Sequence, residues 1–413
     1  MTGASCDSRS HPQPTPGGPP RGPRARLARA AVFGGAFLGP FGGGITVSML
    51  PELGADFGIS ASAASISVTA YLVPFAALML VSGTLGERWG RRRAVLTAYL
   101  VYVVASLVAV FATWLPLFLA MRVLQGAANA FTTPLLLAVV AGSVKPGALG
   151  RALGWFGSLQ AAGQTSAPLL GGLAAEFDWR LAFVGVAVAA ALLAAVGLPP
   201  TARPATRARP RLRSAWRPYV LRIGLVGGLG WGCVAGLNFL VALRLEDAFG
   251  LGAAGRGLLL TALGVAGILT ARVIGSAVDK VGPRRCVLSG VVLGALVVAG
   301  VGLSPAVWLV ALLWAFGGVA TQLVLVGVNA LALGSSRSNQ GGATSVVQSF
   351  RFAFAALGPV VVTPIYHAEA AVAFLVPAAL LLLVGPPTLP RADRGGDGPG
   401  TGTGPTGTAP TTA

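Results

Sequence analysis

GTLGERWGRRR at residues 83–93 and GSAVDKVGPRR at residues 275–285 are two copies of one short pattern. A glycine leads each copy, and an acid, a base, a second glycine and further bases follow at the same offsets. The leading glycines, Gly83 and Gly275, are 275 − 83 = 192 positions apart, close to half of the 413-residue chain. Because each copy follows an apolar stretch long enough to cross a bilayer, the recurrence predicts a membrane protein built from two related halves.

The halves also match where no loop charge is involved. The same interval places Gly126 on Gly318, and an interval shorter by one places Pro168 on Pro359. Because glycine is common in this chain, a single match is weak evidence of duplication, and only the matches taken together support it. Their spread over several apolar stretches indicates a duplication of the whole half.

Composition supports a membrane protein. Hydrophobic residues make up 54% of the chain, charged residues only 10%, and mean hydropathy is +0.76. A soluble domain carries roughly a quarter charged residues. The net charge of +18 falls in short clusters between apolar runs, so nucleic-acid binding is not expected. The three cysteines and two histidines are scattered, and the sequence predicts no metal site, disulfide framework or cofactor.

Apolar runs of about 20 residues are what a helix needs to cross the hydrocarbon core. The predicted fold is therefore all-α, with twelve transmembrane helices in two pseudo-symmetric six-helix bundles. The expected spans are 30–52, 62–86, 93–112, 115–141, 152–175, 179–198, 220–244, 257–279, 285–303, 306–333, 342–365 and 369–386. The expected divisions are a disordered tail at 1–28, bundles at 29–198 and 220–386, a basic linker at 199–219 and a second disordered tail at 387–413.

The orientation of these spans follows from their basic residues. With both termini placed inside, about 23 of the 30 Lys and Arg fall in inner loops and tails. The expected outer loops hold only Arg180, Arg244 and Arg256. This asymmetry predicts a multi-pass protein of the cell membrane with both ends in the cytoplasm.

With these features, the chain resembles a twelve-span major facilitator superfamily transporter over residues 30–386. Residues 83–93 are similar to the family's signature loop, with Glu87 where aspartate is usual. RVLQG at 122–126 resembles the fourth-span arginine motif. GQTSAPLLGG at 163–172 is similar to the fifth-span motif of the drug:proton antiporter branch, with Ala167 replacing its usual glycine.

The repeated loop has a physical interpretation beside the resemblance. The leading glycine lets a neighbouring helix approach closely, and the later glycine lets the backbone turn. Glu87 can pair with an arginine or face the positive end of a helix across the seam between the halves. The resemblance implies a cytoplasmic latch that favours the outward-facing form; the alternative is a well-anchored basic turn. Its candidate residues are Gly83, Glu87, Arg88, Gly90, Arg91, Arg92, Gly275, Asp279, Lys280 and Gly282.

Arg122 is the least expected residue within a span. A lone guanidinium there indicates either anion binding or a structural hydrogen bond, and the resemblance adds an influence on proton release from a nearby acid. The acidic residues, however, lie in tails, loops or span ends. Those nearest to the membrane are Glu52, Asp56, Glu176, Asp178 and Glu369, and Glu52 is taken as the candidate proton carrier.

Polar side chains on apolar spans are expected to line a central pathway, although any one of them could simply bond helices together. The candidates for coupling or substrate binding are Arg122, Gln125, Asn129, Tyr71, Gln160, Gln164, Asn238, Gln322, Gln348 and Arg351. A second group in span five is expected to pack helices tightly and restrict leakage. Its members are Gly163, Pro168, Gly171 and Gly172.

The function predicted from these features is export of a small organic molecule by alternating access, in antiport with protons, by a monomer in a lipid bilayer. The predicted site lies between spans 1, 4, 5, 7, 10 and 11. A proton-coupled importer of a metabolite or organic anion is the main alternative, because two intramembrane arginines without a buried acid suit an anionic ligand. A non-transporting scaffold or receptor is disfavoured by the short loops. No catalytic constellation or phosphate-binding loop points to an enzyme.

Overall fold

The computed structural model describes residues 23–390 except 60, 65, 146, 200–211, 252 and 336–338. The described residues form helices, with short turns between them, and no strand. The first half contains α1 (Pro23–Gly44), η1 (Val47–Met49), α2 (Leu50–Asp56), α3 (Ala61–Ala64), α4 (Ile66–Trp89), α5 (Arg91–Val110), α6 (Leu115–Asn129), α7 (Thr133–Ser143), α8 (Leu149–Ala175) and α9 (Arg180–Val196). The second half contains α11 (Pro218–Gly232), η2 (Ala235–Leu237), α12 (Asn238–Asp247), α13 (Ala253–Val281), α14 (Pro283–Leu303), α15 (Val307–Gly334), α16 (Gln340–Ala368) and α17 (Ala370–Thr388), with the short α10 (Leu212–Ala215) before it.

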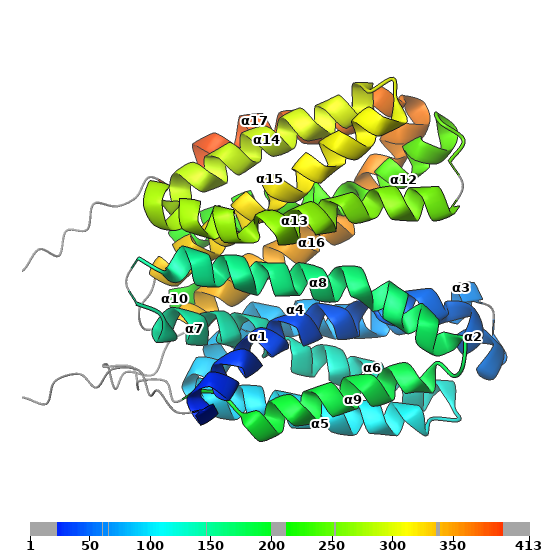
Figure 1. Cartoon of the computed structure of the whole chain (residues 1–413), viewed down its shortest axis with the longest axis vertical. Helices are drawn as coiled ribbons and strands as arrows, with labels where there is room; N and C mark the ends of the chain where they lie inside the picture. The colour runs from blue at the N-terminus through cyan, green and yellow to red at the C-terminus, as the bar shows by residue number, and fades with distance from the viewer. Residues whose placement is uncertain are drawn as a thin grey trace, which may run out of the picture.

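The two halves form two helical bundles that lie side by side (Figure 1). Each bundle has its own hydrophobic core, one built mainly from the first half and the other entirely from residues 215–389. Large apolar side chains also cover outward faces, as on α5, where Leu100 and Val104 are 58% and 60% exposed. Such a surface suits lipid, because water-exposed apolar patches of this extent are rare on soluble proteins.

Nine helical segments among the described residues are long and apolar enough to cross a membrane. The other three predicted spans correspond to α8, α9 and α16, which are also helical. α9 is an apolar helix of 17 residues, whereas α8 and α16 carry more polar side chains. The all-helical, multi-span fold predicted from the sequence is therefore confirmed, with span ends within a few residues of expectation in most cases.

Three spans are interrupted where the sequence predicted continuous helix. The first breaks after Gly44 into a 3₁₀ turn and α2, and the seventh breaks after Gly232 into a 3₁₀ turn and α12. The fourth breaks between α6 and α7 at residues 130–132. The first and seventh spans break in glycine-rich runs, which can adopt helix or turn, so these two breaks depend on contacts that the sequence pattern does not contain.

The duplication extends to individual packing contacts. A Cβ atom on Gly126 would overlap the carbonyl oxygen of Tyr71, and one on Gly318 would overlap that of Leu263. Tyr71 and Leu263 are themselves 263 − 71 = 192 positions apart. The two halves therefore use glycine at equivalent positions to bring equivalent helices together.

The ends of the predicted divisions differ from the observed helices. α1 begins at Pro23, inside the expected first tail, and α17 continues to Thr388, inside the expected second tail. The expected linker contains α10 and the first two residues of α11. Residues 1–22, 200–211 and 391–413, on which the rest of these predictions fall, lie outside the described residues.

Candidate functional site

A central cavity of about 470 Å³ lies between the two halves. Its lining comes from α1, η1, α4, α6, α7 and α8 of the first half and from α11, η2, α12, α13, α15 and α16 of the second. Spans 1, 4, 5, 7, 10 and 11 were expected there, and spans 2 and 8 contribute as well. The predicted polar residues found in the lining are Tyr71, Asn129, Gln160, Gln164, Asn238, Gln322 and Arg351.

The interrupted spans bring backbone to this cavity. Gly43, Gly44 and Val47 line it at the break in the first span, and Ala235 and Gly236 line it at the break in the seventh. Non-helical backbone is tolerated at membrane depth where it is buried in protein or faces a cavity. Equivalent breaks in the two halves therefore frame the cavity from both sides.

Arg351 is the single charged side chain among the described residues that line the cavity. Its side chain comes from α16 and is 5% exposed. The guanidinium stacks on the Trp231 ring at 3.9 Å from the ring centroid, and Nη1 donates to Gln348 Oε1 at 2.8 Å. The cavity thus combines one positive charge with an aromatic face and several amides.

Arg122 lies outside the cavity lining and inside the first bundle, where it is fully buried. Its Nη1 donates to Gly42 O at 3.2 Å and to Gln125 Oε1 at 2.8 Å, and its Nε donates to Ser67 O at 3.3 Å. Its Nη2 also donates to Thr46 Oγ1 at 3.3 Å. These acceptors include groups freed by the break in the first span, so Arg122 holds that break against α4 and α6.

Tyr71 connects the two environments. Its ring lies 4.5 Å from the Arg122 guanidinium carbon and it also lines the cavity. The hydroxyl accepts from Asn129 Nδ2 at 2.7 Å and donates to Gly39 O at 3.3 Å. Arg122 therefore contacts the cavity only indirectly, because the Tyr71 ring that it packs against forms part of the lining. Neither Gln125 nor Gln348 lines the cavity: Gln125 accepts a hydrogen bond from Arg122, and Gln348 accepts one from Arg351.

The first repeated loop joins the halves through Glu87. Both carboxylate oxygens accept from Arg91 Nε, at 2.9 and 2.8 Å, and Oε1 also accepts from the backbone N–H of Gly341 at 2.9 Å. Gly341 lies in the first turn of α16, where backbone N–H groups lack intrahelical partners. Glu87 thus contacts both an arginine and the positive end of a helix in the other half. This set of contacts is called the first latch.

The second repeated loop makes the mirror contact, called the second latch. Asp279 accepts from the backbone N–H of Gly150 at 2.6 Å and from that of Arg151 at 3.0 Å. These groups belong to the first turn of α8 in the opposite half. A Cβ atom on Gly275 would lie 2.7 Å from the Cα of Arg151, so only glycine allows this approach. Both latches lie at the end of the bundles that carries residues 88–93 and 280–285, called here the basic end.

The remaining loop residues have different surroundings. Gly90 and Gly282, at φ +94° and +95°, turn the chain into α5 and α14. Arg88, Arg92 and Lys280 are exposed. These three basic residues therefore lie on the surface, as is usual for a loop at the membrane boundary.

Neutralising Glu87 is expected to loosen the basic end. Glu87→Gln weakens the charge-assisted bonds to Gly341 and Arg91, which are worth roughly 1.5–3 kcal/mol. Thr344 lies at the seam between the halves, where its Oγ1 donates to Pro134 O at 3.2 Å. Labelling of a Thr344→Cys reporter, in a background without native cysteines, should then rise by about tenfold or more. Glu176→Gln removes an exposed carboxylate at the opposite end and should leave labelling unchanged. Equal labelling of both variants would contradict a latch role for Glu87.

The fifth-span group packs α8 against the first span. A Cβ atom on Gly163 would overlap the carbonyl oxygen of Phe37, and one on Gly171 would overlap that of Ile45. Gly172 has more room, since its nearest neighbour would be Ser48 at 3.7 Å. Pro168 lies within α8 and lines the cavity. The group therefore forms both a tight helix contact and part of the cavity wall.

Glu52 lies on α2, where it is exposed and outside the cavity lining. Among the described residues that line the cavity, none is acidic. The structure therefore places the candidate proton carrier away from the other candidate residues.

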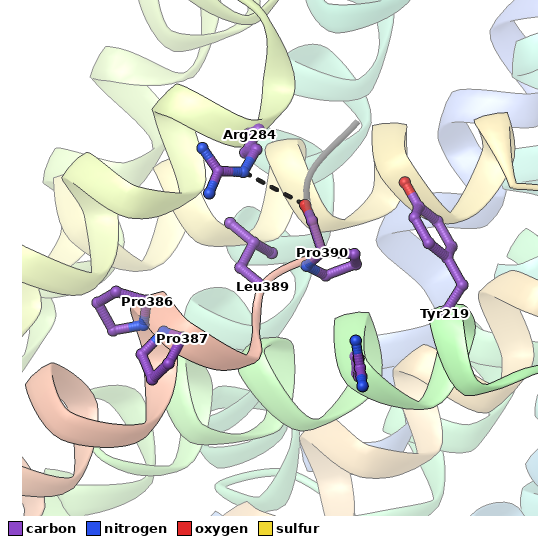
Figure 2. A pocket seen from close by; sticks show the side chains of 7 residues that line it. Tyr219, Arg284, Pro386, Pro387, Leu389 and Pro390 are labelled. Carbon is purple, nitrogen blue, oxygen red and sulfur yellow. Dashed lines mark hydrogen bonds between the residues drawn. The ribbon is translucent and has the colours of Figure 1, made fainter. Parts of the chain in front are cut away.

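A second pocket, of about 480 Å³, lies within the second half only (Figure 2). Arg284 and the prolines at the end of α17 face each other across it, and Arg284 Nε donates to Pro390 O at 3.3 Å. The rest of its lining is Leu389 together with Tyr219 and Arg222 of α11. Because this pocket does not lie between the halves, it is separate from the central cavity.

Known proteins of similar sequence are named as transporters. YybF of Bacillus subtilis, an uncharacterized MFS-type transporter, is 28% identical over 255 residues, which are 58% of this chain and 63% of YybF. The drug efflux pump JefA of Mycobacterium tuberculosis is 33% identical over 164 residues, 39% of this chain and 32% of JefA. The chain therefore spans less than two thirds of the length of these relatives.

Two solved structures share the fold. The human organic anion transporter MFSD10 aligns with a TM-score of 0.73 at 17% identity, covering 90% of this chain and all of MFSD10. The proton:xylose symporter XylE aligns with a TM-score of 0.69 at 13% identity, covering 87% of this chain and 94% of XylE. A family model also matches residues 32–270 and 223–404. These relatives are named as transporters, and the family model, which covers more than half of the chain, shows that the chain belongs to the Major Facilitator Superfamily.

Proposed function

We propose that the chain is a secondary active transporter that exports a small organic molecule across the cytoplasmic membrane, in exchange for protons. The observation that carries the proposal is a cavity lined by both halves, with latches joining those halves at the basic end. Rocking of one half against the other would expose such a cavity to each side in turn. The similarity to the efflux pump JefA supports the outward direction.

The seam suits this motion. Close contacts between α8 and α13 run from Gly150 and Gly275 at the basic end to Thr165 and Gly264 near the middle. Beyond that point the two helices diverge (Figure 1). If the basic end is cytoplasmic, as the distribution of bases predicts, the described conformation is the outward-facing one.

Transport by everted membrane vesicles tests the proposal. Vesicles with an acidified lumen should accumulate at least one dye from a panel of fluorescent anions, neutral molecules and cations, and nigericin should abolish the accumulation. Vesicles lacking the protein provide the baseline. Accumulation in right-side-out vesicles, driven by an inward proton gradient, would instead establish the importer. Transport that persists unchanged without a proton gradient would remove proton coupling from the proposal.

Glu52 is the carrier assigned in this proposal, and its assignment has a separate test. Glu52→Gln should reduce the gradient-driven part of the accumulation in the same vesicles. An unchanged gradient dependence would exclude Glu52. Proton coupling would then have to use a group outside the described cavity lining, because that lining contains no acidic residue.

A further inference from the structure

The described lining of the central cavity carries a positive charge and no negative charge. Arg351 provides a positive charge, and the described residues of the lining include no carboxylate to balance it. The described contacts of the Arg351 head group are an amide and aromatic rings. An uncompensated guanidinium at membrane depth is costly, so a negative partner that enters the cavity gains by neutralising it.

Arg122 provides an internal comparison. Both arginines are almost fully buried in spans, at 0% and 5% exposure. Each of the three Arg122 nitrogens donates to an oxygen of the protein. Arg351 differs, because its Nε is buried without a hydrogen-bond partner among the described residues. The hydrogen-bonding groups of Arg122 are therefore satisfied within the protein, whereas Arg351, which lines the cavity, has a donor without a described acceptor.

The surrounding groups indicate what the rest of a ligand would meet. Trp231 lies under the Arg351 guanidinium, and Phe75 and Phe352 of opposite halves meet edge to face at 4.8 Å in the lining. Gln322 Nε2, a donor from α15, is also buried without a described partner. An apolar or aromatic body with one anionic group matches this arrangement. A cation would be repelled by Arg351 and would find no described acid in the lining.

We propose that the cavity selects a small amphipathic organic anion, and that Arg351 is the specificity-determining residue that binds its negative group. The inference rests on the proposal that the central cavity is the transport site, and it deepens that proposal by naming the substrate class. It applies in either direction of transport, because it concerns recognition rather than coupling.

A matched pair of probes isolates the charge. 1-Anilinonaphthalene-8-sulfonate and N-phenyl-1-naphthylamine share one ring system and differ by the sulfonate. Binding to the full-length protein in nanodiscs is measured by energy transfer from tryptophan, with empty nanodiscs subtracted. The expected result is that the anion binds roughly tenfold more tightly than the neutral amine, because only the anion gains the charge-assisted bond.

Variants identify the residue. Arg351→Gln should remove the preference for the anion while changing neutral-probe affinity by no more than about twofold, since the packing surface is largely kept. Arg351→Lys should retain part of the preference. Arg272→Gln, which removes an exposed arginine of α13, is the matched control and should retain the full preference. Monodisperse elution and an unchanged circular dichroism spectrum check the fold of each variant.

Three outcomes would overturn the inference: equal wild-type affinity for the two probes, binding of neither probe, or equal weakening of both probes by Arg351→Gln. If Arg351→Gln fails to fold, the wild-type preference and its retention in Arg351→Lys still decide the matter. Dye export that continues while the anion preference is absent would remove this inference and leave the proposed function intact. Absence of export together with an intact anion preference would remove the proposed function and leave the binding preference of the cavity intact.

Discussion

Replacing Gly83 with leucine is expected to abolish transport while leaving both bundles folded. A side chain at this position would overlap the backbone of Gly341, where α4 meets the beginning of α16. The two helices would have to separate, and Glu87 would lose the N–H that it binds in the first latch. Overpacking of this kind costs roughly 1–3 kcal/mol, and the cost falls only on the conformation that is closed at the basic end.

The measurement is dye accumulation in everted vesicles, together with labelling of the seam reporter at position 344. Transport should fall to the level of empty vesicles and labelling should rise. Gly185→Leu is the matched control, because a Cβ atom at Gly185 meets nothing within 4 Å. Full transport by Gly83→Leu would show that close approach of α4 and α16 is not required.

Arg122→Ala is expected to destabilise the first bundle and eliminate transport with it. The substitution leaves the acceptors at Gly42, Ser67 and Thr46 without their described donor, in a region closed to water. Leaving such buried partners unpaired costs about 2–5 kcal/mol. The break in the first span, which frames the cavity, should lose its fixed geometry.

Thermal unfolding in detergent and vesicle transport measure the two parts of this prediction. Arg122→Lys should recover part of the stability, because an ammonium can reach fewer of the acceptors. Arg272→Ala is the control for removal of a span arginine that is exposed. A stable Arg122→Ala protein that transports without a proton gradient would instead favour the role in proton release implied by the family resemblance.

The helical, duplicated architecture could be predicted from the sequence because the signals that determine it are local. Apolar run length predicts a span, and the repeated loop predicts the duplication. Polar residues on apolar runs likewise indicated much of the polar lining of the cavity. Gln160, Gln322 and Arg351 belong to it, and exposing such side chains to lipid would cost free energy. These inferences need only the period and length of the pattern.

The parts that sequence reasoning missed depend on tertiary contacts. The break after Gly44 persists because Arg122, nearly 80 residues away, supplies donors to that segment. The same contacts turn Arg122 away from the cavity, where it was expected to provide charge. Nor does the pattern show that span 8 reaches the cavity, because which face of an apolar helix lies inward is set by its neighbours.

The reciprocal arrangement of the two latches has a mechanical consequence. Glu87 reaches from the first half to the second, and Asp279 reaches from the second half to the first. A hinge at the far side that parts the halves as rigid bodies therefore breaks both bonds in one event. Each 1.4 kcal/mol that the pair contributes lowers the occupancy of the parted form about tenfold. The distance between the two halves across this gap should therefore jump between two levels.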